Sequence, residues 1–316
     1  MVLKFRIFWF YKVSIFFVIK IKIEQIKETK MKFENILSEG CAAPLVILGA
    51  VNAYSAMLAR DAGAKALYIS GSGVAAASYG LPDLGITSLE NVLEDVRRIS
   101  SAVELPLLVD IDTGWGSVFH IQRTVKEMIK AGVAAIHIED QIEQKRCGHR
   151  ANKALVSKEQ MIQRLDAVHA ANTHNQLFII ARTDAYASEG LDAAIARAQA
   201  YVNAGAQAIF AEALTTLAEY EAFCQAVSVP VLANITEFGV TPLFTQQELG
   251  EVGVKMVLYP LSAFRAMNQA ALAVYQDILN GGSQCASLPQ MQTREALYQH
   301  LDYYRYEHYF DNQVEC

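Results

Sequence analysis

A short pattern that recurs four times between residues 61 and 260 constrains the fold more than any other feature of the chain. Each copy has a glycine at its third position, then an apolar run, and ends seven positions after the glycine. The copies are Asp61–Ser70, Lys130–Glu139, Asn203–Glu212 and Glu251–Pro260. Glycine suits the left-handed residue that ends many helices, and a short apolar run is typical of a strand buried on both faces. Each copy therefore predicts the end of a helix followed by a buried strand.

Further apolar runs lie between these copies and bring the expected number of strands to eight. They are Leu45–Leu48, Leu105–Val109, Leu177–Ala181 and Val229–Ala233. Helical patterns separate the runs, and Thr87 with Glu90 and Ser157 with Gln160 match the capping box that begins many helices. Strict alternation of strand and helix predicts a (β/α)8 TIM barrel with right-handed crossovers. A doubly wound open sheet is the alternative, but no glycine-rich dinucleotide or phosphate loop supports it.

Polar residues stand where the expected strands end. They are Ser70, Asp110, Asp112, Glu139, Arg182, Glu212 and Asn234. Barrels of this type carry their chemistry at the carboxyl ends of the strands. We therefore expect these side chains to form one site.

Two of these carboxylates, Asp110 and Asp112, have the side-chain period of a strand, so we expect them to share one face, with Glu139 on the next strand. Hard oxygen ligands suit Mg²⁺ or Mn²⁺, which keep several waters and complete their shell with the substrate. The alternative is that each Asp simply ends a strand and caps the next turn. Because the carboxylates occur together, we favour a divalent metal site.

The loop Lys145–Arg150, with the sequence Lys-Arg-Cys-Gly-His-Arg, places one thiol among four potentially cationic side chains. Neighbouring cations lower the pKa of a thiol. We therefore expect Cys147 to have a lowered pKa and to donate or accept a proton. The alternative is a solvated basic loop in which Cys147 has no role.

Composition limits the classes of protein to consider. The chain has 316 residues, of which 53% are hydrophobic and 19% charged, so residues 31–316 can bury the core of one large domain. A net charge of −6, without a basic stripe, argues against nucleic acid as a partner. The five cysteines are scattered and lack a Cys-x-x-Cys spacing, which predicts a reducing, cytoplasmic location rather than disulfides or a zinc site.

The two ends of the chain differ from the barrel. Within residues 1–30, lysine and arginine interrupt the apolar residues and leave Val13–Ile19 as the longest uncharged run, shorter than the ~20 residues that span a membrane. We expect this segment to be an extension upstream of a natural start at Met31, with a membrane-surface anchor as the alternative. The tail from about residue 262 to 316 predicts two further helices, Ala263–Leu279 and Glu295–Phe310, which the barrel does not need.

Six motifs resemble the isocitrate lyase and phosphoenolpyruvate mutase superfamily, in particular its 2-methylisocitrate lyase branch, from about Phe33 to Phe310. They begin at Asp110 (Asp-Ile-Asp-Thr-Gly-Trp-Gly), Ile138 (Ile-Glu-Asp-Gln), Lys145, Ala181 (Ala-Arg-Thr-Asp), Asn234 (Asn-Ile-Thr-Glu-Phe-Gly) and Tyr259 (Tyr-Pro-Leu-Ser-Ala-Phe-Arg). The cysteine-bearing loop is what separates the lyases from the mutases. Where the superfamily reads Ser-Gly-Gly after its second strand, this chain has Ser70-Gly71-Ser72.

The resemblance implies a carbon–carbon lyase that cleaves 2-methylisocitrate, a tricarboxylate, into pyruvate and succinate in the methylcitrate cycle of propionate catabolism. It implies that Asp110 and Asp112 hold Mg²⁺, with Asp83 and Glu139 as outer supports. Tyr68 matches the position that takes up the hydroxyl proton, although a tyrosine in an apolar strand is more often plain core. Cys147 would donate the proton that completes succinate, and Lys145, Arg146 and His149 would stabilise its thiolate.

The resemblance also implies a set of substrate-binding positions and an assembly. The positions are Ser70, Gly71, Ser72, Cys147, Gly148, Arg182, Glu212, Asn234, Ile235, Thr236, Arg265 and Arg294. Arg294 would be a carboxylate clamp delivered by the tail, or else a surface cation. The expected assembly is a homotetramer that exchanges a terminal helix between subunits, and a tail folded back on its own barrel is the alternative.

Three other functions stay open at this point. Isocitrate lyase differs by one methyl group of the substrate, which is worth only ~1 to 3 kcal/mol. Oxaloacetate hydrolase or decarboxylase activity occurs on the same scaffold. A non-catalytic scaffold protein is the third possibility, because fold alone does not fix function, but the polar set at the strand ends is present in full.

Overall fold

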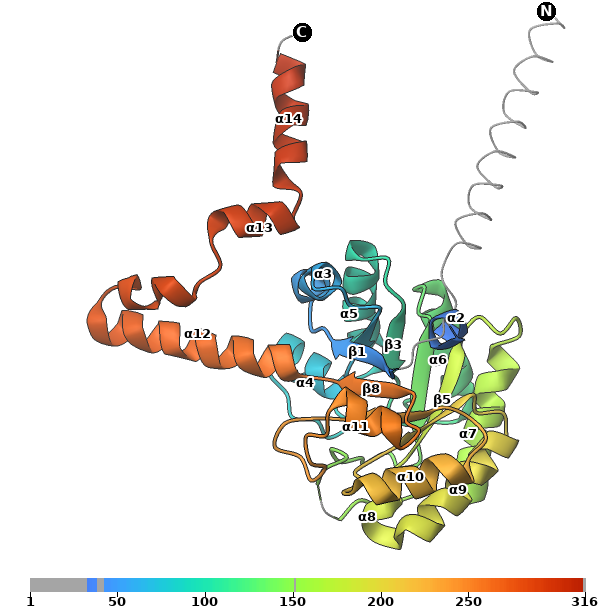
Figure 1. Cartoon of the computed structure of the whole chain (residues 1–316). Coiled ribbons are helices and arrows are strands. Elements are labelled where there is room, and N and C mark those ends of the chain that lie inside the picture. Colours follow the sequence, from blue (N-terminus) through green and yellow to red (C-terminus); the bar gives the residue numbers. More distant parts are fainter. Residues whose placement is uncertain (1–32, 39–42, 151, 315–316) are drawn as a thin grey trace, which may run out of the picture.

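The computed structural model describes residues 33–38, 43–150 and 152–314, so the extension predicted for residues 1–30 lies outside the described residues. Eight parallel strands pair in chain order, and the last pairs with the first to close a barrel (Figure 1). The strands are β1 (Leu45–Gly49), β2 (Ala66–Ile69), β3 (Leu107–Asp110), β4 (Ala135–Glu139), β5 (Phe178–Thr183), β6 (Ala208–Ala211), β7 (Val231–Asn234) and β8 (Met256–Tyr259). The predicted (β/α)8 barrel is confirmed.

Helices connect successive strands and surround the barrel. Before and between the strands lie α2 (Phe33–Ser38), α3 (Ala53–Asp61), α4 (Gly71–Tyr79), α5 (Leu89–Ala102), α6 (Val118–Lys130), α7 (Lys158–Ala171), α8 (Tyr186–Glu189), α9 (Leu191–Asn203), α10 (Leu217–Ala226) and α11 (Gln246–Glu251). Beyond β8 follow α12 (Ser262–Gly281), the 3-10 helix η1 (Cys285–Gln290), α13 (Arg294–His300) and α14 (Tyr303–Val314). None of the helices in the described ranges is long and apolar enough to cross a membrane.

The repeated glycines have the predicted role. Gly63, Gly132, Gly205 and Gly253 have φ angles of 93°, 78°, 97° and 97°, immediately after α3, α6, α9 and α11. Residues other than glycine rarely adopt this conformation. Each glycine turns the chain from a helix into the next strand, which explains why the pattern recurs.

The core has two layers, as a barrel surrounded by helices requires. One layer fills the barrel with side chains such as Ile47, Leu108 and Phe210, and the other packs the outer face of the strands against the helices. Phe33 of α2 packs against Phe178 at the start of β5, with ring centroids 5.4 Å apart. The amino end of the barrel is therefore filled by apolar groups, and the polar residues lie at the other end.

One of the two predicted capping boxes is confirmed and the other is displaced. Ser157 and Gln160 begin α7 as expected. At α5 the box is formed by Ser88 and Asn91, one residue beyond the predicted Thr87 and Glu90. Ser88 and Asn91 supply the same two hydrogen bonds that Thr87 and Glu90 would supply, so the helix begins one residue later than predicted.

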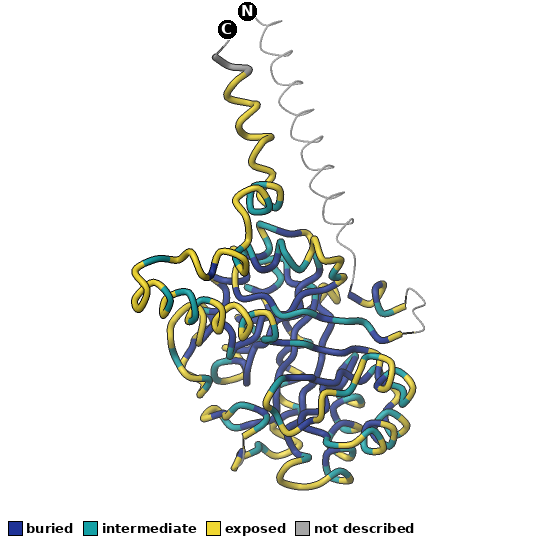
Figure 2. Tube along the Cα trace, turned by 60° about the vertical axis from the view of Figure 1, so that its left-hand side comes forward, coloured by how far each residue is buried: buried dark blue, intermediate teal, exposed yellow. Residues whose placement is uncertain are grey.

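The tail contains the long helix expected at residues 263–279, here α12, but the second predicted helix is divided. Asp302 adopts a left-handed conformation, with φ of 53°, and separates α13 from α14. None of the 20 residues of α12 is buried, and Leu272, Tyr275 and Leu279 are exposed. The tail leads away from the barrel, and α14 projects beyond it (Figures 1 and 2).

Contacts with the barrel resume only at α13. Tyr54 of α3 donates a hydrogen bond of 2.8 Å to Gln292, and His300 lies 2.5 Å from Asp61. These contacts hold α13 against the outer surface of α3 rather than over the carboxyl ends of the strands.

Candidate active site

The structure brings the polar residues predicted at the strand ends to one end of the barrel. All seven are buried, with exposed fractions between 0% and 8%. They are Ser70 after β2, Asp110 and Asp112 at and beyond the end of β3, Glu139 on β4, Arg182 on β5, Glu212 after β6, and Asn234 on β7.

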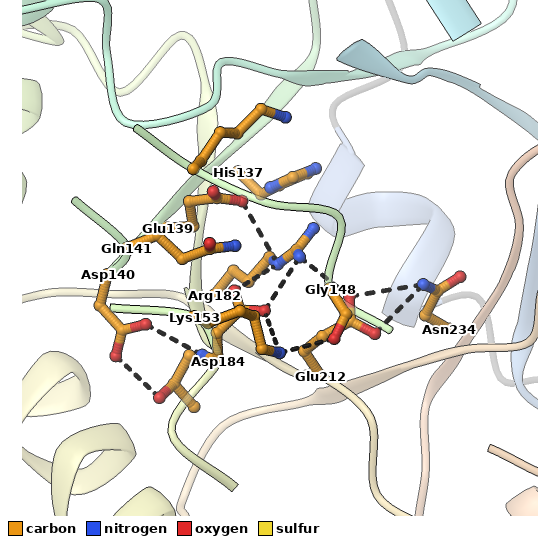
Figure 3. Close-up of polar contacts among 12 residues, drawn as sticks. His137, Glu139, Asp140, Gln141, Gly148, Lys153, Arg182, Asp184, Glu212 and Asn234 are labelled. Atoms are coloured by element: carbon orange, nitrogen blue, oxygen red, sulfur yellow. Dashed lines mark hydrogen bonds and ion pairs between the residues drawn. The ribbon is translucent and has the colours of Figure 1, made fainter. Parts of the chain in front are cut away.

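The guanidinium of Arg182 lies at the centre of this group, among three carboxylates (Figure 3). Its Nε atom is 2.9 Å from Asp184 and 3.4 Å from Glu139, and its Nη2 atom is 3.2 Å from Glu212. The guanidinium also lies 4.9 Å from the centre of the Phe210 ring. A buried charge needs such partners, because burial without them is very unfavourable.

Glu212 is ionised despite its burial. Burial alone would raise the pKa of this carboxyl, but the charge of Arg182 and the hydrogen bond from His149 lower it to about 2. The backbone N–H of Val240 donates to Nδ1 of His149 at 3.2 Å, so the ring carries its proton on Nε2, which lies 3.1 Å from Glu212. Asn234 donates to both oxygens of Glu212 at 3.4 Å.

Asp110 and Asp112 lie together, but not in the way that the strand period predicted. β3 ends at Asp110, and Asp112 lies in a turn with φ of 49°. The N–H of Asp112 donates to Oδ1 of Asp110 at 2.9 Å, and the N–H of Gly71 donates to Oδ2 at 3.2 Å. A tight turn after the strand therefore brings the second carboxylate back beside the first.

The two carboxyl groups differ in pKa. Burial opposes ionisation of Asp110, but His137, Lys145 and Arg182 outweigh it and lower the pKa. Burial and the neighbouring Asp110 raise the pKa of Asp112 to about 6, against the opposing charge of Lys145. Asp110 is thus the stronger acid of the two.

Tyr68 and His137 form a second pair inside the barrel, next to Asp110. The Tyr68 hydroxyl lies 2.9 Å from Nε2 of His137 and 3.4 Å from Oδ2 of Asp110. Burial raises the pKa of Tyr68 well above its usual value and lowers the pKa of His137 to about 4. Both side chains are therefore neutral near pH 7.

The predicted effect of the cationic loop on Cys147 is wrong. Lys145 turns to the carboxylates and lies 2.7 Å from Asp83 and 2.5 Å from Asp112. Burial raises the pKa of the Cys147 thiol, although a hydrogen bond from the backbone of His149 opposes this effect. Neighbours in the sequence do not surround the thiol in space, because the loop directs Lys145 and His149 to different carboxylates.

The loop approaches the site most closely at Gly148. A Cβ atom there would lie 2.5 Å from Nη2 of Arg182 and 2.6 Å from Cδ of Glu212. Only glycine allows the backbone to come this near. Cys147 is therefore carried by a loop that contacts the centre of the site directly.

The other predicted substrate-binding residues are divided between the site and the surface. Gly71 and Ser72 form the first turn of α4, next to Asp110, and Ile235 and Thr236 are buried directly after β7. Arg265 is 44% exposed on α12, where it lies 3.6 Å from Glu237 and over the Phe238 ring. Arg294 is exposed at the start of α13, so this chain does not bring it to its own site.

Four residues of the site were missed by the sequence reasoning. They are Lys153, Asp184, Asp140 and His137. Lys153 and Asp184 form an ion pair of 2.8 Å, and Asp140 accepts hydrogen bonds from Thr183 and Tyr201. His137 forms a hydrogen bond with Tyr68. Asp184 stands two residues after Arg182 in the Ala-Arg-Thr-Asp motif that begins at Ala181. This spacing was the signal that could have placed Asp184 beside Arg182. Nothing near Lys153 in the sequence marks it, because the loop that it follows is irregular.

Comparison with known proteins identifies the family. The family model described as phosphoenolpyruvate phosphomutase matches residues 33–279. The chain belongs to this family. A 2-methylisocitrate lyase of Escherichia coli is 59% identical over 270 residues, which cover 85% of this chain and 91% of that protein. A 2-methylisocitrate lyase of Vibrio cholerae is 57% identical over 274 residues, which cover 85% and 89%.

Solved structures of the phosphoenolpyruvate mutase and isocitrate lyase superfamily have the same fold. A 2,3-dimethylmalate lyase is 31% identical with a TM-score of 0.80, and the match covers 89% of this chain and 93% of that one. An oxaloacetate acetylhydrolase is 30% identical with a TM-score of 0.81, covering 88% and 95%. A phosphonopyruvate hydrolase in complex with oxalate and Mg²⁺ is 30% identical with a TM-score of 0.74, covering 84% and 93%.

The carboxylates of this phosphomutase-family site fit a weakly coordinated divalent cation. Within the residues that the structure describes, no group of three or more His, Cys, Asp or Glu side chains is arranged to hold a metal ion by itself. Mg²⁺ does not require one, because it is usually held by one or two carboxylates together with water and substrate. Oδ2 of Asp112 and both carboxyl oxygens of Glu139 are buried without a hydrogen bond, which is the condition that a cation and its waters would relieve.

We predict that Glu212→Gln destabilises the protein in a pH-dependent way. The folded pKa of about 2 lies below the ordinary value of 4.5, so the stabilisation is complete above pH 4.5 and is lost as the pH falls through 2. The free energy of unfolding in urea should be lower than that of the unmodified protein by ~3 kcal/mol at pH 6, and the gap should narrow to ~1 kcal/mol at pH 3.

The control for this prediction is Glu251→Gln, which changes an exposed carboxylate on α11 and should leave the free energy of unfolding unchanged. A gap for Glu212→Gln that stays constant between pH 6 and pH 3 would contradict the ionic explanation.

Proposed function

We propose that this chain cleaves 2-methylisocitrate into pyruvate and succinate, as part of propionate catabolism in the cytoplasm. The observation that carries the proposal is the seating of the Cys147 loop. Gly148 and His149 press this loop against Arg182 and Glu212, beside the carboxylate pair Asp110 and Asp112. The thiol as a proton donor, the guanidinium of Arg182 and the carboxylates for a divalent cation thus lie together at the carboxyl ends of the strands. The identity to the two named lyases supports the same reaction.

Asp110 and Asp112 would hold Mg²⁺, with Asp83 and Glu139 as outer supports, and Mn²⁺ could replace it. When bound, the cation supplies Lewis-acid chemistry, lowering the pKa of the substrate hydroxyl and neutralising negative charge. The solved phosphonopyruvate hydrolase with oxalate and Mg²⁺ supports this assignment. Lys145 lies between Asp83 and Asp112 and keeps these carboxylates in place.

Tyr68 would take up the proton of the substrate hydroxyl. Because its phenol is protonated, Tyr68 can accept a proton only if its own proton moves on. Nε2 of His137, 2.9 Å away, is the acceptor that this geometry offers. The same hydrogen bond orients the phenol towards the Asp110 side of the site.

The succinate half becomes a carbanion next to a carboxylate when the carbon–carbon bond breaks. Its charge spreads onto the carboxylate oxygens and requires fixed hydrogen-bond donors. The ion pairs of Arg182 use Nε and Nη2, so Nη1 remains for a substrate oxygen. Asn234 and Thr236 lie beside it at the end of β7. Ser70, Gly71 and Ser72 begin α4 next to the site, where the backbone N–H of Ser72 would bind the pyruvate carboxylate while that of Gly71 holds Asp110.

Cys147 would complete succinate. Its S–H bond breaks, a C–H bond forms at the carbanion, and the sulfur is left as a thiolate. The raised pKa of Cys147 suits this order of events, because the thiol keeps its proton until a strong base is generated beside it.

The substrate preference is tested with the purified protein and Mg²⁺. We expect release of pyruvate from 2-methylisocitrate, followed by a coupled assay, with a higher kcat/KM than for isocitrate or oxaloacetate. Removal of the cation with EDTA should abolish turnover, and added Mg²⁺ should restore it. A preference for isocitrate or for oxaloacetate would overturn the substrate assignment.

Substitution of Cys147 by serine tests the proton donor. We predict that Cys147→Ser lowers kcat by about 10²-fold to 10⁴-fold, because a hydroxyl is a much weaker acid than a thiol. Thermal unfolding should be unchanged, since the side chain packs in a loop rather than in the core. Cys285→Ser is the matched control, because Cys285 is exposed in η1. Full activity in Cys147→Ser would remove this residue from the mechanism.

We also propose that the tail exchanges α12 between subunits of a homotetramer. The support is the set of exposed apolar residues on α12, among them Leu272, Tyr275 and Leu279, in a helix that has no buried residue within the described chain. In such an assembly Arg265 and Arg294 would bind a carboxylate in the site of a neighbouring subunit.

The assembly predicts a mass of four times 34.9 kDa by light scattering after gel filtration. Leu272→Glu and Leu279→Glu should lower this mass, because each places a charge on the apolar face of α12, which a neighbour would bury. Gln269→Glu changes an exposed polar residue of the same helix and should have no effect. A monodisperse species with the mass of one chain would contradict the exchange.

A further inference from the structure

Lys153 forms a buried connection between the cysteine loop and the barrel. Its Nζ atom donates a hydrogen bond of 2.6 Å to the carbonyl oxygen of Gly148 and lies 2.8 Å from Oδ1 of Asp184 (Figure 3). The side chain of Lys153 is 1% exposed and that of Asp184 is fully buried. Asp184 itself is fixed by Arg182 and by its backbone N–H, which donates to Asp140. The loop is therefore anchored to the same carboxylate network that holds Arg182.

The peptide that Lys153 holds is the one that contacts the thiol. The carbonyl of Gly148 and the N–H of His149 belong to one peptide group, and in a trans peptide they point in opposite directions. The carbonyl faces Lys153, while the N–H of His149 forms a hydrogen bond with the Cys147 thiol. Fixing the carbonyl on one edge of this peptide consequently fixes the donor on the other edge.

We propose that Lys153 is a positioning residue for the lyase reaction: it orients the peptide between Gly148 and His149 so that the His149 N–H faces the sulfur of Cys147. This inference rests on the proposed function of Cys147 as proton donor. A thiolate produced by proton donation then meets a hydrogen-bond donor already in place. The ammonium also polarises the peptide carbonyl, and polarisation strengthens the N–H at its other end.

The surroundings of Cys147 show why this one donor matters. Burial has the largest effect and raises the pKa of the thiol, and the nearby Asp83 and Glu212 raise it further. Arg182 acts in the opposite direction, but the backbone N–H of His149 has the larger lowering effect. The donor that favours the thiolate most is thus the one that depends on Lys153, and Lys145, expected to do this, instead faces Asp83 and Asp112.

A neutral side chain of similar length at position 153 tests the proposal. Lys153→Met keeps the apolar stem and removes the ammonium. We expect kcat for 2-methylisocitrate to fall by about 10-fold to 100-fold, the usual effect of losing an outer partner of an active-site group. The matched control is Lys158→Met, which changes an exposed lysine at the start of α7 and should leave kcat unchanged.

A second readout follows the thiol directly and needs no substrate. The rate of Cys147 alkylation by iodoacetamide is measured against pH on the full chain, with mass spectrometry to separate Cys147 from the other cysteines. In Lys153→Met the midpoint of this profile should rise by about half a pH unit or more, because the thiolate is the reactive form and loses its donor. A change in the limiting rate of Cys147 alkylation at high pH would reflect the accessibility of the loop, so the midpoint alone is compared between Lys153→Met and the unmodified protein.

The outcomes separate this inference from the proposed function. A folded Lys153→Met protein with an unchanged midpoint, or with unchanged kcat, would overturn the role of Lys153. A shifted midpoint in a chain that shows no lyase activity would leave the effect of Lys153 on the thiol intact and would reject the proposed function.

A measurement on the unmodified protein decides the matter if Lys153→Met does not fold. A water-soluble acetylating reagent that reacts with amines should modify Lys153 at least about 10-fold more slowly than Lys158, because Lys153 is buried and ion-paired. Equal rates at the two lysines would show that the connection is not formed, and would overturn the proposal.

Discussion

The ion-pair cluster around Arg182 is the interaction on which the rest of the site depends. One buried guanidinium holds Glu139, Asp184 and Glu212, which come from three neighbouring strands or the segments that follow them. Two of these carboxylates extend the network outwards: Asp184 contacts Lys153, and Glu212 contacts His149 and Asn234. Loss of Arg182 would remove the cation that these buried carboxyl groups share, so the cluster fixes the strand ends and the loop together.

This network explains how a loop, rather than a strand or a helix, can hold the Cys147 thiol in a fixed position. The loop is fastened at Lys145 to Asp83 and Asp112, at His149 to Glu212, and through Gly148 to Lys153. These fastenings lie on both sides of Cys147. The position of the thiol is consequently set by buried charges of the barrel rather than by the local conformation of the loop.

Much of the fold and of the site could be predicted from the sequence, and the features that could not be predicted have physical explanations. The glycine repeat and the apolar runs report local backbone preferences, so the eight strands and the residues at their ends were predicted correctly. Asp112 was assigned to the wrong geometry because a left-handed turn, not strand alternation, returns it to Asp110. Lys145 was assigned to the wrong partner because the sequence shows which residues are adjacent but not where their side chains point. The role of Lys153 depends on tertiary contacts and carries no local signal.

The charge distribution also argues for the kind of chemistry that Cys147 performs. Had the neighbouring cations surrounded the thiol, they would have lowered its pKa and favoured a nucleophile. Instead Lys145 faces Asp83 and Asp112, His149 faces Glu212, and burial raises the pKa of Cys147. A thiol in such a place holds its proton until a carbanion forms nearby, and the N–H of His149 then accommodates the thiolate. Burial of the thiol and placement of that single donor together favour an acid over a nucleophile, as a lyase that protonates its product requires.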